Sequence, residues 1–257
     1  MALFKRAYLL FLASALALPE TSCIFNDLEP CEDANIGFSI TNNWGTDTSA
    51  DPEGMAYLFF YDSGCEPWRF DFPGKEAGRI SLPEGSYSFI MFNDDTASID
   101  FVSDENEHIF ATTKNVTIGF DPHIGELRAS PDMMWADASI LVKLDPNCLE
   151  YTTSEYAKKI DLIHNADMNM ITNPQQIVAR YTLLINHIEN LSGVACMKGL
   201  LSGMASGINL NTNTHSEKAV SIPFDLSVAA DSAVCSEFLT FGLPGSHPPP
   251  RKRRFSP

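Results

Sequence analysis

Polar and apolar residues alternate along several short segments of the chain, which is the pattern of β-strands with one buried face. The clearest example is Val220–Leu226, where every second side chain is apolar and Ser221, Pro223 and Asp225 occupy the positions between. Because proline lacks a backbone N–H, a strand that contains Pro223 is expected at a sheet edge or beside a bulge. The glycines in Ser202–Gly207 predict a bend or bulge between two strand segments.

Other segments are apolar almost without interruption. Arg180–Ile188 is rich in β-branched and aromatic residues, which predicts a well-buried strand. Phe38–Thr41 and Met55–Tyr61 predict two more strands. Helical signals are few, and Ser154–Ile160 is the segment that we expect to form a short helix. Short strands separated by clusters of turn residues predict an all-β chain with few short helices.

One turn has a more specific sequence. Leu82–Gly85 reads Leu-Pro-Glu-Gly, with proline at the second and glycine at the fourth position of a β-turn. Tyr87, Phe89 and Met91 then occupy every second position of a predicted strand. The sequence Leu-Pro-x-Gly-x-Tyr resembles a corner of transthyretin-like and immunoglobulin-like sandwiches, where the chain crosses between sheets and the tyrosine closes the turn. Any antiparallel hairpin could use the same turn.

The length of 257 residues and the hydrophobic content of 44% are sufficient for two domains. We expect two tandem β-sandwiches at residues 34–120 and 132–242, joined by a linker at 121–131 that contains proline, glycine and charged residues. Residues 243–257 are rich in proline and include a basic cluster, which predicts a disordered tail.

Residues 1–22 predict a secretory signal peptide, with two basic residues ahead of the apolar segment Ala7–Leu18. This segment is too short to span a bilayer as a helix. Ala15–Ala17 has the small residues that an ordinary signal peptidase accepts, whereas Thr-Ser-Cys at 21–23 resembles the end of a bacterial lipobox. Glu20 departs from the lipobox pattern. We favour acylation of Cys23, with residues 23–33 as a lipid-anchored tether.

The formal net charge is −16 at pH 7. Nucleic acid is therefore an unsuitable partner, because phosphate binding requires clustered lysine and arginine. Six cysteines in an exported chain predict some disulfides, and Cys31 with Cys65 is one candidate pair, although the sequence does not determine connectivity. The sequence has no CxxC pair and no HExxH motif, so we expect no metal and no other cofactor.

No catalytic motif emerges from the sequence, and we expect a protein that is not an enzyme. Gly199–Gly203 lacks the GxSxG spacing of a nucleophile elbow, and acidic residues such as those near Asp94 are typical of solvated loops. Exposed tryptophans offer a different chemistry, because they stack against sugar rings. The candidates are Trp44, Trp68 and Trp135, although tryptophan is more often found in protein cores.

Seven short segments, taken in their order along the chain, resemble those of a known family. They are Cys23–Cys31, Glu66–Gly74, Leu82–Tyr87, Asn93–Thr96, Ser130–Ala136, Leu201–Ala205 and Phe238–Gly242. Together they resemble a Bacteroidetes lipoprotein family of unknown function, similar in layout to fimbrial anchor and fimbrillin-type proteins, over about residues 18–242. The resemblance implies two tandem β-sandwiches on an outer-membrane lipid anchor, and it implies no catalytic residues.

The leading hypothesis is a cell-surface lipoprotein of the outer membrane with a structural or adhesive role, such as a fimbria-like anchor or tip component. Fimbrial or other protein subunits would bind by adding a strand to a free sheet edge. The alternative is a carbohydrate-binding accessory lipoprotein with a glycan as ligand. If Cys23 is not acylated, the expected location is the periplasm.

Overall fold

The computed structural model describes residues 35–61, 66–103, 108–117, 125–145, 148–153, 168–230 and 232–246. The predicted signal peptide, Cys23, Cys31, Cys65, the helix expected at Ser154–Ile160 and residues 247–257 lie outside these ranges. The described residues form strands and loops with a 3-10 helix at Leu191–Gly193, which confirms the all-β prediction. Within them, no helix has the length and apolar character that a membrane crossing requires.

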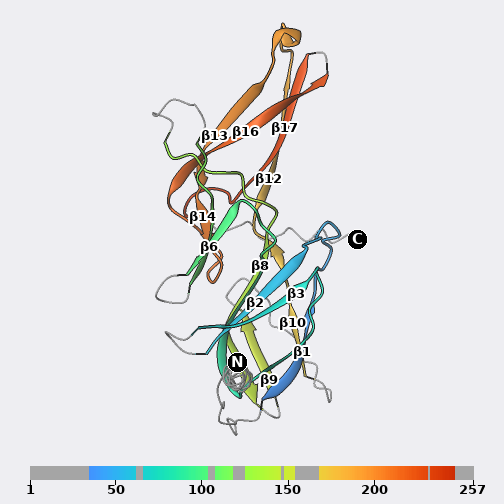
Figure 1. Ribbon diagram of the computed structural model, residues 1–257, viewed down its shortest axis with the longest axis vertical. Coiled ribbons are helices and arrows are strands. Elements are labelled where there is room, and N and C mark those ends of the chain that lie inside the picture. The colour runs from blue at the N-terminus through green and yellow to red at the C-terminus, as the bar shows by residue number, and fades with distance from the viewer. Residues whose placement is uncertain are drawn as a thin grey trace, which may run out of the picture. The chain divides into compact units, whose positions relative to one another are not determined.

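Two sheets enclose the first hydrophobic core (Figure 1). The smaller sheet has the order β10-β1-β4, with β10 parallel and β4 antiparallel to β1. Its strands are β1 (Ile36–Asn42), β4 (Arg79–Leu82) and β10 (Asn169–Thr172). The larger sheet has the order β11-β8-β5-β2-β3, and β9 also pairs with β8. Its strands are β2 (Gly54–Phe60), β3 (Trp68–Pro73), β5 (Gly85–Asn93), β8 (Trp135–Asp145), β9 (Cys148–Thr153) and β11 (Gln175–Gln176).

Two four-stranded sheets complete the described fold. The first has the order β15-β14-β7-β6 and consists of β6 (Ile99–Ser103), β7 (Ile109–Thr113), β14 (Gly207–Asn209) and β15 (Thr214–His215). The second has the order β12-β17-β16-β13 and consists of β12 (Ala179–Asn186), β13 (Met197–Ala205), β16 (Ala219–Ala230) and β17 (Ala233–Thr240).

The strand β2 is buried on both faces. Met55, Tyr57 and Phe59 belong to the core that the two first sheets share. Leu58 and Phe60 belong to a second core, together with residues of β6, β7 and β14. This arrangement explains the uninterrupted apolar sequence of the segment, because a strand that is covered on both sides has no solvent-facing positions.

The corner predicted at Leu82–Gly85 is confirmed. β4 ends in the three-stranded sheet and β5 begins in the larger sheet, so the chain changes sheets within this turn. The Tyr87 hydroxyl donates to the Pro83 carbonyl oxygen at 2.9 Å. The tyrosine therefore closes the turn, and the arrangement of the two sheets around one core is that of a sandwich.

The strand pairing does not divide the chain at residues 121–131. β8, which follows this segment, pairs with β5, and β14 pairs with β7, which precedes the segment. Residues that were expected in the linker also make backbone contacts. The Arg128 N–H donates to the Ser221 carbonyl oxygen at 3.0 Å, and the Ala129 N–H donates to the Lys114 carbonyl oxygen at 2.8 Å. A division into consecutive sandwiches at 34–120 and 132–242 is therefore not confirmed, because sheets combine strands from both sides of it.

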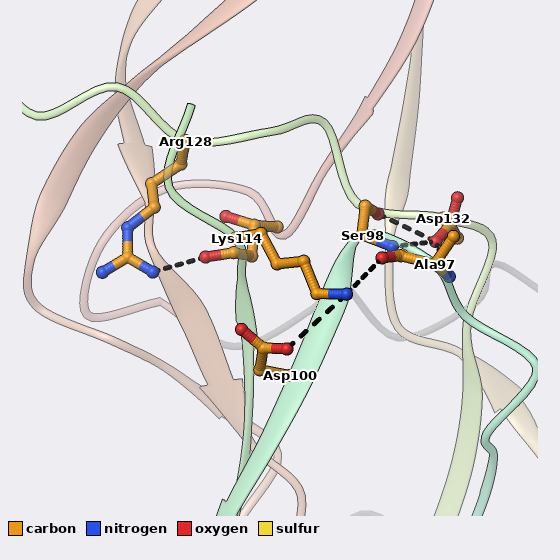
Figure 2. A network of polar contacts seen from close by, with 7 residues as sticks. Ala97, Ser98, Asp100, Lys114, Arg128 and Asp132 are labelled. Atoms are coloured by element: carbon orange, nitrogen blue, oxygen red, sulfur yellow. Dashed lines mark hydrogen bonds and ion pairs between the residues drawn. The ribbon is translucent and has the colours of Figure 1, made fainter. Parts of the chain in front are cut away.

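Side chains also form hydrogen bonds between residues 128–132 and the β6–β7 hairpin with its flanking residues (Figure 2). The Arg128 guanidinium donates to the Thr113 carbonyl oxygen, and Lys114 Nζ donates to the Ala97 carbonyl oxygen at 2.6 Å. One Asp132 oxygen accepts hydrogen bonds from the N–H groups of Ala97 and the residue after it, both at 2.7 Å. Residues 128–132 are thus held by several partners, unlike a free linker.

β16 contains the strand predicted at Val220–Leu226 and shows how proline is accommodated. It pairs with β13 along this stretch, but its pairing with β17 covers only residues 227–230. The Ser221 N–H donates to the Glu126 carbonyl oxygen at 2.9 Å, away from β13. The nitrogen of Pro223, two residues further, points the same way, so its missing N–H interrupts no ladder bond. β16 as a whole is an inner strand of its sheet, and Pro223 lies where β16 has not yet begun to pair with β17.

The bulge predicted within Ser202–Gly207 lies in β13. The register against β16 shifts between Ser202 and Met204. Gly203, between them, has a φ of 80°, which glycine adopts without steric cost.

Tyr57 adds a pH-dependent contribution to stability. Burial raises its pKa to about 12, a hydrogen bond from Asn42 acts in the opposite direction, and the charge of Glu76 raises the pKa further. The pKa in the unfolded chain is about 10, so this stability is complete below pH 10 and is lost as the pH rises toward 12. We expect the free energy of unfolding to fall by about 2 kcal/mol over that interval in urea denaturation. Tyr57→Phe should remove this part of the pH dependence, and an unchanged dependence would contradict the assignment.

Candidate functional site

The three candidate tryptophans lie in different environments. Trp44 and Trp135 pack edge to face, with ring centroids 6.1 Å apart and planes at 86°. Their indole N–H groups are bonded within the protein, Trp44 to the Lys75 carbonyl oxygen at 3.1 Å and Trp135 to Asp47 Oδ2 at 3.2 Å. Trp68 begins the edge strand β3 and is 49% exposed. Of these three residues, Trp68 is the one whose ring is displayed to solvent, so sugar stacking remains a prediction chiefly for it.

The described residues can be examined for metal and cysteine chemistry. They include no group of three or more His, Cys, Asp or Glu side chains that could hold a metal ion. Cys196 is exposed, Cys235 is half-buried, and neither forms a disulfide. Acylation of Cys23 and a bridge between Cys31 and Cys65 concern residues outside the described ranges and stay predictions.

β12 differs from its sequence prediction. The strand forms, but it lies at the edge of the sheet β12-β17-β16-β13, and none of its residues is buried. Tyr181, Leu184 and Ile185 are 38%, 57% and 40% exposed. The prediction of a well-buried strand for Arg180–Ile188 is therefore wrong. Apolar composition makes a strand suitable for burial, but it does not determine whether another layer packs against it.

One face of this sheet gathers apolar side chains, of which those on β12 and Val228 are exposed or half-buried, whereas Val234 and Phe238 are buried. Cross-strand pairing places Tyr181 opposite Phe238, Ile185 opposite Val234, and Val228 on the other side of Val234. We call this surface the apolar face. Its residues are Tyr181, Leu183 and Ile185 of β12, Val234 and Phe238 of β17, Phe224, Leu226 and Val228 of β16, and Met197 and Leu201 of β13.

Three aromatic rings form a row across the apolar face. Tyr181 stacks on Phe238 with centroids 5.8 Å apart, and Phe238 stacks on Phe224 at 4.3 Å. The row ends above Gly199 of β13, where a Cβ atom would lie 2.2 Å from the Phe224 ring. The three rings pack against one another in the middle of the apolar face. Val228, at the end of this face, is 60% exposed. Exposed apolar surface of this kind is typical of an interaction site.

The opposite face of the same sheet carries the charged side chains, together with the exposed Leu184 of β12. Arg180 Nη1 lies 2.6 Å from Glu237 Oε1, and Lys198 Nζ lies 3.4 Å from Asp225 Oδ1. These ion pairs are solvent-exposed and add little to stability. The charged side chains of these strands therefore lie on this face, and the apolar face carries none.

Among the described residues, the architecture is all-β, with β12 as a terminal strand and with an apolar face on its sheet. The chain belongs to the family described as a domain of unknown function (DUF5119), which it matches over residues 22–225. This result confirms the predicted resemblance to a family of unknown function. No curated protein matches the sequence.

Several solved structures are similar in fold. An adhesin candidate from Bacteroides ovatus has a TM-score of 0.61 and 20% sequence identity, and the match covers 87% of this chain and 72% of that one. The fimbrial anchor protein Mfa2 from Porphyromonas gingivalis has a TM-score of 0.49 and 11% identity, covering 83% and 76%. A candidate polysaccharide-binding protein from Bacteroides thetaiotaomicron has a TM-score of 0.49 and 9% identity, covering 80% and 71%. These neighbours are described as adhesin, fimbrial and binding proteins rather than enzymes, and the first of them shows the shared fold.

Proposed function

We propose that this protein is a cell-surface lipoprotein, anchored in the outer membrane through Cys23, with a structural or adhesive role such as a fimbria-like anchor or tip component. Its partner is a protein subunit that adds a β-strand to the edge of β12. The observation that carries this proposal is an edge strand whose apolar side chains remain exposed. An added strand would pair with the free N–H and C=O groups of the edge and cover Tyr181, Leu183 and Ile185 at the same time.

Site-specific photo-crosslinking on intact cells tests this contact. A photoreactive residue at Ile185, on the apolar face, is expected to yield an adduct of one discrete mass with a protein subunit. Val102 is the matched control, because it is an exposed apolar residue on β6, a terminal strand of a different sheet. Equal adduct yields at the two positions, or no discrete adduct at Ile185, would contradict strand addition at β12.

The same cell-derived protein tests the anchor. Intact mass should place the mature N-terminus at an acylated Cys23, and protease treatment of whole cells should remove the protein from the surface. A free N-terminus near Leu18 together with resistance to protease would contradict the surface role and favour the periplasm.

A carbohydrate-binding accessory lipoprotein is the second candidate, and the exposure of Trp68 favours it. In this case the indole would stack on a sugar ring of a surface glycan. Glycan-array binding that disappears in Trp68→Ala, with crosslinking at Ile185 absent, would favour this function over strand addition.

A further inference from the structure

The outer edge of β12 lacks the features that protect a sheet edge from pairing with another chain. Terminal strands are commonly protected by proline, by bulges or by charged side chains directed at the edge. β12 contains no proline, its register against β17 is regular, and Arg180 is its one charged residue. Arg180 Nη1 lies 2.6 Å from Glu237 Oε1 of β17, so this charge is directed toward the neighbouring strand and not outward.

Two other terminal strands carry such protection. β13, at the opposite end of the same sheet, contains the bulge at Gly203. β3 ends in Pro73 and carries Arg69 and Asp71, whose side chains form an ion pair at 2.9 Å. The contrast singles out β12 as a strand whose edge remains suited to pairing.

The hydrogen-bond pattern shows which residues of β12 present their backbone to this edge. The Leu239 N–H and carbonyl oxygen both bond to Ser130 Oγ, at 3.0 and 2.9 Å, on the side where residues 126–128 bond to β16. Leu239 therefore directs neither group toward β12, and Arg180, which lies opposite it, directs neither group toward β17. Alternate residues share this direction, so the even-numbered residues of β12 have their N–H and C=O groups at the outer edge.

The sequence of β12 is complementary to a second copy of itself. We consider an antiparallel pair of β12 strands that is centred on Leu183, in which the even-numbered residues of the two copies exchange backbone hydrogen bonds. The opposing residues are Tyr181–Ile185, Leu183–Leu183, Thr182–Leu184 and Arg180–Asn186. Apolar side chains of the two apolar faces then meet one another, an aromatic ring lies beside a β-branched side chain, and no like charges are opposed.

Other registers are less suitable. Because the residues at the two outer edges must meet, the register can shift only in steps that keep even-numbered residues opposite one another. A pair centred on Thr182 would place Arg180 opposite Leu184. A pair centred on Leu184 would place Tyr181 opposite His187, which lies beyond the strand and has a φ of 63°. The pair centred on Leu183 also brings the largest part of the strand into register.

Charge and symmetry determine how such a pair would assemble. The formal net charge of −16 makes two copies repel each other. The joint itself is held by backbone hydrogen bonds and apolar contacts, and its two Arg180 residues lie at opposite ends of the pair. Salt should therefore favour pairing, because it screens the repulsion and leaves these contacts in place. Each copy uses its β12 edge once about a two-fold axis, so assembly closes at a dimer.

We propose that the partner that adds a strand to β12 is a second copy of this chain, paired antiparallel about Leu183 in a two-fold symmetric dimer. The two sheets become one continuous sheet, with both apolar faces on the same side and with Tyr181 of each copy beside Ile185 of the other. The proposal rests on strand addition at β12, the contact of the proposed function, and names its partner.

Disulfide crosslinking tests the register. The two Leu183 residues form a non-hydrogen-bonded pair with Cα atoms about 4.5 Å apart, which a disulfide can span. Leu183→Cys should give a covalent dimer when the purified mature chain is oxidised by dioxygen with copper phenanthroline. Ile185→Cys is the matched control, because its counterpart lies about 13 Å away along the strand. It should give no more dimer than the unsubstituted chain, in which thiols such as Cys196 set the background. A mixture of the Tyr181→Cys and Ile185→Cys proteins should crosslink again, since these positions oppose each other.

Sedimentation velocity measures the dimer without a crosslink. The mature chain is expected to sediment as a dimer, and its dissociation constant should fall about threefold or more as salt is raised from about 50 to 500 mM. Leu184→Pro removes an N–H at the outer edge and should weaken the dimer by about tenfold or more. If this variant does not fold, crosslinking of Leu183→Cys and the salt dependence still decide the question.

The outcomes separate this proposal from the proposed function. A monomer at concentrations up to about 100 μM, or equal crosslinking of Leu183→Cys and Ile185→Cys, would overturn the dimer. A discrete photo-adduct at Ile185 with a protein of different mass would also overturn it, but would leave strand addition at β12 intact. A photo-adduct of twice the mass of the chain supports both, and a monomer without any adduct contradicts both.

Discussion

Replacing Phe59 with alanine is expected to lower the free energy of unfolding by about 3–5 kcal/mol. The side chain has no exposed surface, and its ring centroid lies within 6.3 Å of those of Phe38, Phe70, Tyr87 and Phe89. These rings come from both sheets that enclose the first core. Truncation therefore removes buried apolar area and leaves a cavity that surrounding rings cannot fill without moving. Urea denaturation followed by circular dichroism measures the loss.

Trp68→Ala is the matched control for this substitution. Trp68 lies directly opposite Phe59 across the β2–β3 ladder, but it is 49% exposed. Its truncation should cost about 1 kcal/mol or less. Similar losses in the two variants would show that the ring cluster around Phe59 is not the centre of the core.

Asn42→Ala is expected to cost about 2–4 kcal/mol, because it disconnects a buried polar network. Asn42 Nδ2 donates to the Tyr57 hydroxyl oxygen at 2.6 Å and to the Lys75 carbonyl oxygen at 2.8 Å. Its Oδ1 accepts a hydrogen bond from Thr172 Oγ1 at 2.7 Å. Tyr57 and Thr172 are fully buried, so their hydroxyl groups would lose this partner without gaining water. The network links β1 to the parallel strand β10 and to β2.

The same variant has a second, spectroscopic readout. Because the Asn42 hydrogen bond lowers the pKa of Tyr57, its removal should raise that pKa further above the usual range in an absorbance titration. The neighbouring Asn43→Ala is the control, since Asn43 is exposed and bonds to Asn173 Oδ1 at 3.0 Å on the surface. It should change stability by no more than about 0.5 kcal/mol. An unaltered Tyr57 titration in Asn42→Ala would refute the assigned role of the amide.

Local features of the fold could be predicted from the sequence because they depend on neighbours in the chain. The turn at Leu82–Gly85 and the hydroxyl of Tyr87 lie within a few residues, so the corner follows from local stereochemistry. The strand at Val220–Leu226 and the bulge at Gly203 likewise follow from alternation, proline and glycine. The family resemblance rested on such short segments, and it is confirmed over most of the chain.

The candidate sites were less accessible to sequence reasoning. Met55–Phe60 and Arg180–Ile188 have similar apolar sequences, yet the first is covered on both faces and the second lies at an exposed edge. The three tryptophans could not be ranked either, because burial of Trp135 and exposure of Trp68 depend on strands distant in the chain. The outer edge of β12 has no sequence motif, since it exists only where the folded sheet ends.

The sequence by itself determined the strand content, the corner and the family. Only the tertiary structure decided that β8 pairs with β5 across the expected linker and that β12 remains at an edge. The physical reason is that periodicity reports which side of a strand is apolar. The strand or layer that meets that side is chosen by long-range pairing and packing, for which nearby residues carry no signal.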